Sequence, residues 1–372
     1  MIASGFRAGP AVAMLSLGLV ACGRDEAVVV YVSADESVAR PVLAAFTDET
    51  GIPVTPVFDT EATKTTGLAN RLRAERDRPR ADLFWSSEIA HTVTLADEGV
   101  LVAPTGATPV EWPETLRDGQ SRWFAFAPRA RVIVVPESMP DDERPETWMD
   151  LTDERWRGRI AMADPRFGTT RTHLGAMRWW WEREVMPGYF DAWAEGLAEN
   201  EVRLLTSGNA GVVDAVARGE ALVGLTDTDD VFAARERGAV ERGFQVELVY
   251  PRHAPDARAP AGGTLLIPNT VAIVAGSSRP DEARRLLEFL LSEKVERMLF
   301  ESPSRNIPRR LALDPEAEAM FVPPEPVEID WASASRIADE AVKSLLDATE
   351  EAGRRRAEPA PAVRDSEEAV AP

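Results

Sequence analysis

Short apolar runs alternate with amphipathic stretches through the first part of the chain. Residues 27–32, 52–58 and 80–85 are rich in β-branched and aromatic side chains, which predicts strands, the first of them buried on both faces. Between the first two runs, apolar side chains share one helical face at Val38, Val42, Leu43 and Phe46. This order of strand, helix and strand predicts a parallel sheet with right-handed crossovers.

A second set of runs follows a proline-rich connection. Further strands are predicted at residues 123–127, 130–135, 159–163, 222–225, 244–250 and 263–274. Amphipathic helices are predicted at residues 281–300 and 331–346. Because 372 residues are many for a single core, we predict an α/β protein with two lobes, joined by the strands that cross between them.

Each predicted lobe combines two stretches of sequence. One lobe comprises residues 28–125 and 264–310, and the other comprises residues 126–263 and 311–350. Residues 351–372 mix arginine, proline, alanine and acidic side chains without a core-forming period. They are predicted to form a disordered tail.

The N-terminus has the pattern of an export signal. Arg7 precedes an apolar stretch at residues 11–20, which is too short to span a bilayer comfortably. Residues 19–22 resemble the bacterial lipobox, and Cys22 is the only cysteine in the chain. We therefore expect a signal peptide at residues 1–21, a lipidated Cys22 that begins a linker ending at residue 27, and no membrane contact beyond this anchor. An ordinary secretory signal is the alternative.

The charge balance limits the possible partners. The chain has 42 basic and 62 acidic residues, a formal net charge of −20. Such a charge argues against binding to nucleic acid or to anionic lipid. It is compatible with a cationic ligand, although surface acidity also serves solubility.

Residues 224–230 follow a predicted strand and carry three carboxylates and two hydroxyls. Asp227, Asp229 and Asp230 would repel one another without a nearby cation or hydrogen-bond donors. Aspartate is also a common helix-capping residue, so capping is the alternative. Acidic and hydroxyl side chains follow three other predicted strands, at Asp35, Glu36, Glu61, Ser87 and Glu88. Ligands of parallel sheets bind beyond the carboxyl ends of the strands, where these side chains would lie.

Two further loops combine glycine with hydroxyl or amide side chains before a predicted helix. They contain the anion-binding candidates Gly168, Thr169, Thr170, Arg171, Ser207 and Asn209. Backbone N–H groups at a helix N-terminus can hold an anion, but the same residue types also serve as helix caps. The histidines His91, His173 and His253 occur in no metal or nucleophile motif, and we predict that the protein is not an enzyme.

The order of several segments resembles the periplasmic solute-binding proteins of ABC importers, specifically the ferric-ion-binding group. The resemblance rests on residues 30–33, 46–51, 81–85, 95–101, 219–225 and 304–308. It implies a type II-like periplasmic-binding-protein fold, in which each lobe is a mainly parallel sheet flanked by helices and hinge strands join the lobes. It also implies a receptor in the periplasm or at the outer face of the cytoplasmic membrane. Its partners would be a small ligand and an ABC permease, and we expect a monomer.

The resemblance implies a metal site with altered ligands. Ferric members commonly use a histidine after the first strand, a glutamate after the third and paired tyrosines after the Gly-Leu strand. The corresponding positions here are Asp35, Glu88 (or its neighbour Ser87), Asp229 and Asp230. The implied ligand is Fe³⁺ or another hard cation, with a synergistic anion near Gly168, Thr169, Thr170, Ser207 and Asn209.

Two other ligands remain open. Carboxylates also suit a cationic organic solute such as a polyamine. Arg166 and Arg171 would favour a phosphonate or phosphate ester if their loop faces the ligand.

Overall fold

The first lobe is built on three parallel strands. The computed structural model describes residues 27–59, 66–106, 112–238, 245–253, 262–323 and 325–357. In the first lobe, β1 (Val28–Val32) lies between β2 (Val54–Phe58) and β3 (Leu83–Ser86). The antiparallel strand β10 (Leu266–Val274) pairs with β3 and with the short β4 (Leu101–Val102). Cys22, Glu61 and the predicted signal peptide lie outside the described residues.

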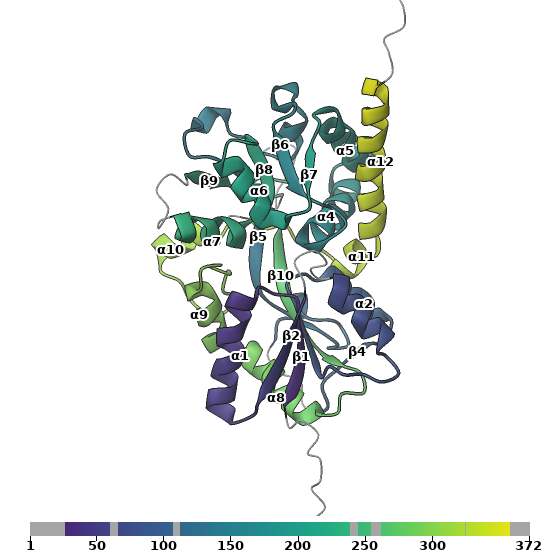
Figure 1. Cartoon of the computed structure of the whole chain (residues 1–372), viewed down its shortest axis with the longest axis vertical. Coiled ribbons are helices and arrows are strands. Elements are labelled where there is room, and N and C mark those ends of the chain that lie inside the picture. The colour runs from purple at the N-terminus through teal and green to yellow at the C-terminus, as the bar shows by residue number, and fades with distance from the viewer. Residues whose placement is uncertain are drawn as a thin grey trace, which may run out of the picture.

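The second lobe repeats this arrangement. β6 (Ile160–Ala163) lies between β7 (Arg203–Leu205) and β8 (Val223–Asp227), and all three strands are parallel. The long strand β5 (Phe124–Pro136) pairs antiparallel with β10 in one lobe and with β8 and β9 (Val246–Val249) in the other. Figure 1 shows β5 and β10 passing through the waist between the lobes. The predicted two-lobed α/β fold with crossing strands is therefore confirmed.

Helices cover both sheets, and they alternate with the strands as the hydrophobic pattern predicts. Those in the first lobe are α1 (Glu36–Thr50), α2 (Thr66–Ala74), α3 (Ala90–Asp97), α8 (Pro280–Leu290) and α9 (Glu293–Glu301). Those in the second lobe are α4 (Gly168–Glu184), α5 (Tyr189–Glu199), α6 (Gly208–Ala217), α7 (Thr228–Gly238) and α12 (Ala338–Ala357). The short helices α10 (Pro315–Phe321) and α11 (Trp331–Arg336) lie near the waist (Figure 1), where α11 contacts both α3 and α4.

Short 3-10 turns complete the connections between these elements. They are η2 (Glu114–Leu116), η3 (Asp141–Glu143), η4 (Met149–Thr152) and η5 (Glu154–Trp156).

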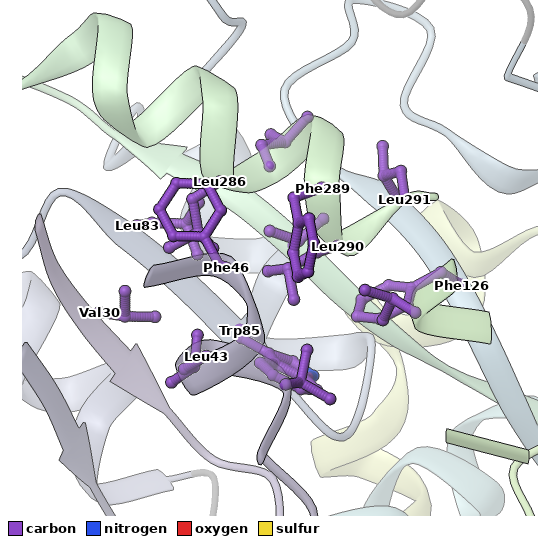
Figure 2. Packing of buried hydrophobic residues seen from close by; sticks show 14 of the residues in the cluster. Val30, Leu43, Phe46, Leu83, Trp85, Phe126, Leu286, Phe289, Leu290 and Leu291 are labelled. Atoms are coloured by element: carbon purple, nitrogen blue, oxygen red, sulfur yellow. The ribbon is translucent and has the colours of Figure 1, made fainter. Parts of the chain in front are cut away.

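Each lobe has its own aromatic core. In the first lobe, Phe46 of α1 packs edge-on against Phe289 of α8 with ring centroids 5.4 Å apart, and Trp85 and Phe126 belong to the same core (Figure 2). The second lobe is rich in tryptophan, and its core includes Trp148, Trp156, Trp180, Trp181 and Trp193. The two lobes are therefore packed around separate cores, which β5 and β10 connect.

The prediction of a disordered tail from residue 351 is wrong for residues 351–357. Helix α12 continues to Ala357, and Ala352 is only 2% exposed against the second lobe. Arg354 pairs with Glu350 one turn earlier, and Arg356 donates to the Ala198 carbonyl at the end of α5. Alanine, arginine and glutamate all favour helix. They extend α12 beyond residue 350 because burial of the small side chain of Ala352 is enough to hold this part of the helix against the second lobe. No helix in the described ranges is both long enough and apolar enough to cross a bilayer.

Gly224 allows α6 to pack closely on β8. A Cβ at this position would lie 2.5 Å from Val212 Cγ1 and 2.9 Å from Val134 Cγ1. We predict that Gly224→Ala lowers the free energy of unfolding by about 1–3 kcal/mol, because this overpacks a core layer. Gly353→Ala is the matched control, since its Cβ would meet nothing within 4 Å and alanine favours the helix by about 0.5–1 kcal/mol. Equal effects of the two substitutions in urea unfolding would contradict this account.

His253 makes the second lobe sensitive to acid. Burial lowers the pKa of His253 from 6.5 to about 4, despite its hydrogen bond with the Gly263 carbonyl. The native state then binds fewer protons than the unfolded state between these values, so stability is lost as the pH falls from 6.5 toward 4. Between about pH 7 and about pH 4.5, wild type should lose about 2 kcal/mol more unfolding free energy than His253→Leu. Parallel losses in the two proteins would show that His253 does not contribute.

Candidate functional site

A cavity of about 400 Å³ is lined by residues of both lobes. The first lobe contributes residues at the ends of β1 and β3, among them Asp35 and Ser87. The second lobe contributes the end of β8 and the starts of α4, α6 and α7. The cavity therefore lies beyond the carboxyl ends of the parallel strands, which is where ligands of such sheets bind.

The acidic loop of the sequence forms a compact cluster in the cavity wall. Asp227 ends β8, and Asp229 and Asp230 lie in the first turn of α7. One carboxylate oxygen from each residue lies within 4.8 Å of the other two, which is close enough for a shared cation. Asp35 also lines the cavity from the first lobe. Three predicted metal ligands, Asp35, Asp229 and Asp230, thus lie at one cavity together with Asp227.

Two buried arginines, which were not predicted from the sequence, accompany the aspartates. Arg129 and Arg131 alternate on β5 and so point to the same face, and Arg131 pairs in register with Asp227 of β8. Arg131 Nη1 lies 2.9 Å from Asp227 Oδ1, and Arg129 Nε lies 3.4 Å from Asp229 Oδ2 and 3.6 Å from Asp227 Oδ2. The sequence did contain a signal for this pair, namely two arginines at alternate positions of an otherwise apolar strand. Buried guanidinium groups need anionic partners, so such arginines indicate nearby carboxylates.

Arg129 is electrostatically coupled to both lobes. Burial by itself would lower its pKa, but Asp229, Asp227, Asp230 and Asp35 together raise it above the ordinary value. Its Nη2 also donates to the Ser87 carbonyl in the first lobe. The guanidinium therefore stays charged and partly neutralises the carboxylates, although four aspartates still outnumber two arginines.

Polar side chains from α4 and α6 hold the Asp227 carboxylate in place. Asn209 Nδ2 donates to Asp227 Oδ2 at 2.8 Å and to Thr169 Oγ1 at 2.8 Å. Thr169 Oγ1 donates to the same Asp227 oxygen, while Thr170 Oγ1 lies 3.4 Å from Asn209 Oδ1. Asp227 is 1% exposed, so these donors replace the water that an ionised carboxylate requires.

Three helices begin at the cavity without a side-chain cap. The N-cap residues of α1, α4 and α6 are Asp35, Phe167 and Ser207, and none of these side chains accepts a capping hydrogen bond. Gly168 and Gly208, the first residues of α4 and α6, have φ values of 58° and 72°, a region that glycine adopts readily. Helix N-termini favour negative charge, so they stabilise the nearby carboxylates and could hold a ligand anion.

Three predicted site residues lie elsewhere in the described structure. Glu88 does not line the cavity but caps α3, accepting from the N–H groups of Ala90 at 2.6 Å and His91 at 2.9 Å. It also accepts from Thr172 Oγ1 of α4 at 2.6 Å, which connects the two lobes. Its role as a metal ligand is therefore not supported, because its oxygens already satisfy buried donors.

Arg171 and Glu36 are also absent from the described lining of the cavity. Arg171 Nε pairs with Asp339 Oδ1 of α12 at 2.9 Å, since α4 turns this side chain toward the C-terminal helix. Glu36 lies on the exposed face of α1 and pairs with Arg40. In contrast, the predicted ligand- or anion-binding residues Ser87, Gly168, Thr169, Thr170, Ser207 and Asn209 all line the cavity.

Known proteins share this fold. Iron uptake protein A1 of Synechocystis is 24% identical over 287 residues, which cover 75% of each chain. A Trichodesmium protein (IdiA, FutA), solved with iron and citrate, superposes with a TM-score of 0.71 at 18% identity, covering 87% of this chain and 99% of its own. AfuA of Actinobacillus pleuropneumoniae, solved with fructose-6-phosphate, superposes with a TM-score of 0.68 at 16% identity. The match covers 87% of this chain and 98% of the AfuA chain.

A family model covers most of the chain. The model described as bacterial extracellular solute-binding protein matches residues 28–302, from the first strand to the end of α9. This range includes all the strands of both lobes, the aspartates of the cavity wall and the two buried arginines beside them. The chain therefore belongs to the bacterial extracellular solute-binding proteins.

Proposed function

We propose that this protein is the receptor of an ABC importer and that it binds a hard metal ion, Fe³⁺ in the first instance, between its lobes. The observation that carries the proposal is the set of Asp227, Asp229 and Asp230, whose oxygens come within 4.8 Å of one another, with Asp35 on the same cavity. Carboxylate oxygens are hard ligands and suit Fe³⁺ as well as Ca²⁺, Mg²⁺ or Mn²⁺. Iron is favoured because the relatives named above include an iron uptake protein and a structure with iron and citrate.

The proposed site would bind iron without phenolate ligands. The chain has three tyrosines, Tyr31, Tyr189 and Tyr250, and the described structure places none of them in the cavity lining. The carboxylates of Asp229 and Asp230 would take the place that paired tyrosines have in the ferric-binding group. A carboxylate set discriminates less between hard cations than a tyrosinate set, so the choice of metal depends more on the accompanying anion.

An oxyanion would complete the proposed metal site. Arg129 faces the cavity and would repel a trivalent ion unless a negative group lay between them. The uncapped starts of α4 and α6 line the same cavity through Thr169, Thr170, Ser207 and Asn209. These groups could hold a synergistic anion such as citrate, which would bridge the guanidinium and the metal.

The receptor role also rests on the sequence of the N-terminus. Residues 1–21 and Cys22 would direct export and lipid attachment, keeping the protein in the periplasm or at the outer face of the cytoplasmic membrane. Closure of the lobes around the ligand would present one surface to an ABC permease. We also propose that the protein is a monomer. We propose no enzymatic activity, because the relatives carry names of binding and uptake proteins.

Metal binding should be visible as thermal stabilisation. We predict that Fe³⁺ supplied with citrate raises the Tm of the wild-type protein, because a ligand that binds only the folded state stabilises it. Asp229→Ala/Asp230→Ala should weaken binding at least about a hundredfold, equivalent to about 3 kcal/mol, and so abolish the shift.

Two single variants serve as controls for this experiment. Glu36→Ala removes an exposed carboxylate next to Asp35 and should leave the shift unchanged. Glu88→Gln should lower the starting Tm but retain the shift, since Glu88 caps α3 outside the cavity. Absence of a shift with iron, calcium, magnesium and manganese alike would overturn the metal proposal.

The second candidate function is capture of a phosphate ester. It is favoured by Arg129 in the cavity, by three uncapped helix N-termini there, and by the fructose-6-phosphate in the AfuA structure. If it is correct, fructose 6-phosphate should raise the Tm without any metal, and Arg129→Met should abolish that shift. Arg171→Met is the matched control because Arg171 pairs with Asp339 away from the cavity. No metal-free shift with phosphate or its esters would exclude this alternative.

A further inference from the structure

A buried polar cluster lies behind the cavity wall, inside the tryptophan-rich core of the second lobe. It consists of Trp148, His173 of α4 and His253, none of which is more than 1% exposed. The ring centroids of His173 lie 4.5 Å from Trp148 and 5.7 Å from His253, and those of Trp148 and His253 lie 6.0 Å apart. Histidines are costly in such an apolar core unless their ring nitrogens have partners.

Arg131 connects this cluster to the ligand cavity. Its Nε donates to His173 Nδ1 at 3.2 Å. Its Nη1 donates to Asp227 Oδ1 at 2.9 Å and to Asn209 Oδ1 at 3.2 Å. One guanidinium thus holds two residues of the cavity wall on one side and a buried histidine on the other.

These contacts determine where the proton of His173 lies. A guanidinium can only donate hydrogen bonds, so Nδ1 of His173 must offer a lone pair and its proton must be on Nε2. Burial and the nearby Arg131 both lower the pKa of His173 well below its ordinary value, so the ring is neutral. Protonation of Nδ1 would place two donors against each other in the core.

His253 has the opposite tautomer. Its Nδ1 lies 3.0 Å from the Gly263 carbonyl oxygen, which can only accept, so the proton is on Nδ1 and Nε2 is an acceptor. Within the described residues, His173 Nε2, His253 Nε2 and Trp148 Nε1 have no hydrogen-bond partner. Two donors and one acceptor do not make a metal site, because only one of the three atoms has a lone pair to give.

We propose that His173, through the lone pair of its Nδ1, is a positioning residue that fixes Arg131 against Asp227. Without the Nδ1 acceptor, the Nε–H of Arg131 would be buried and unpaired, and the guanidinium would rotate to find a partner. Asp227 and Asn209 would then lose the donor that sets their orientation in the cavity. The proposal rests on the proposed function only in that these two residues line the ligand site.

The tautomers can be tested without any ligand. The chain has only three histidines, so the ring nitrogen signals in a long-range ¹H–¹⁵N NMR spectrum can be assigned with His91→Asn and His253→Leu variants. We expect a protonated Nε2 and an unprotonated Nδ1 in His173, and the reverse in wild-type His253. A His173 ring that is protonated on Nδ1 at neutral pH would overturn the proposal, whether or not the protein binds iron.

Two substitutions separate positioning from simple core stability. His173→Asn keeps an acceptor oxygen near the position of Nδ1, whereas His173→Leu removes it. The protected Arg131 Nε–H signal should persist in the asparagine variant and disappear in the leucine variant. With Fe³⁺ supplied as citrate complex, Kd should rise at least about tenfold in His173→Leu and stay within about threefold of wild type in His173→Asn.

Trp181→Phe is the matched control for core damage. Trp181 packs in the same core, and its Nε1 donates to the His253 carbonyl rather than to Arg131. This variant should lower the Tm while leaving the Kd and the Arg131 signal unchanged. Retention of both the Arg131 signal and the wild-type Kd in a folded His173→Leu protein would contradict a positioning role.

Discussion

The pairing of Arg131 with Asp227 is the constraint on which the cavity depends. It joins β5, a strand that runs through both lobes, to the end of β8, from which α7 carries Asp229 and Asp230. A buried carboxylate of this kind is stable only with its donors, and Arg131, Asn209 and Thr169 supply them. Arg129 lies two residues earlier on the same strand. If β5 bent between the lobes, the guanidinium of Arg129 would therefore move relative to the carboxylates of the cavity.

The charge of the site explains why its ligand need not be a bare cation. Arg129 and the N-termini of α1, α4 and α6 lie beside the carboxylates and offset part of their negative charge. A metal ion alone would repel Arg129 and the positive helix N-termini from the carboxylates. An oxyanion bound with the metal would instead give these positive groups a negative partner. The same arrangement accounts for the rival ligand, since an organic phosphate would use Arg129 and the helix N-termini without the metal.

The fold and part of the cavity wall could be predicted from the sequence because both follow from local patterns. Apolar periodicity located the strands, and parallel topology placed Asp35 and Ser87 at the carboxyl edge of one sheet and Thr169 and Asp229 at that of the other. Glu88 could not be distinguished from a ligand, because a glutamate after a strand can either cap the next helix or face the cavity. Arg129 was missed because its partners, Asp227 and Asp229, are far away in sequence. Only the pairing of β5 with β8 brings these residues together.

Crystals of the protein grown with Fe³⁺ and citrate, with diffraction measured at the iron absorption edge, test the central claim most directly. We predict one anomalous peak within coordination distance of the Asp229 and Asp230 carboxylates, with citrate between the iron and Arg129. Density for an anion on Arg129 and the starts of α4 and α6, with no anomalous peak near the aspartates, would contradict the account. It would identify the protein as a receptor for an organic anion.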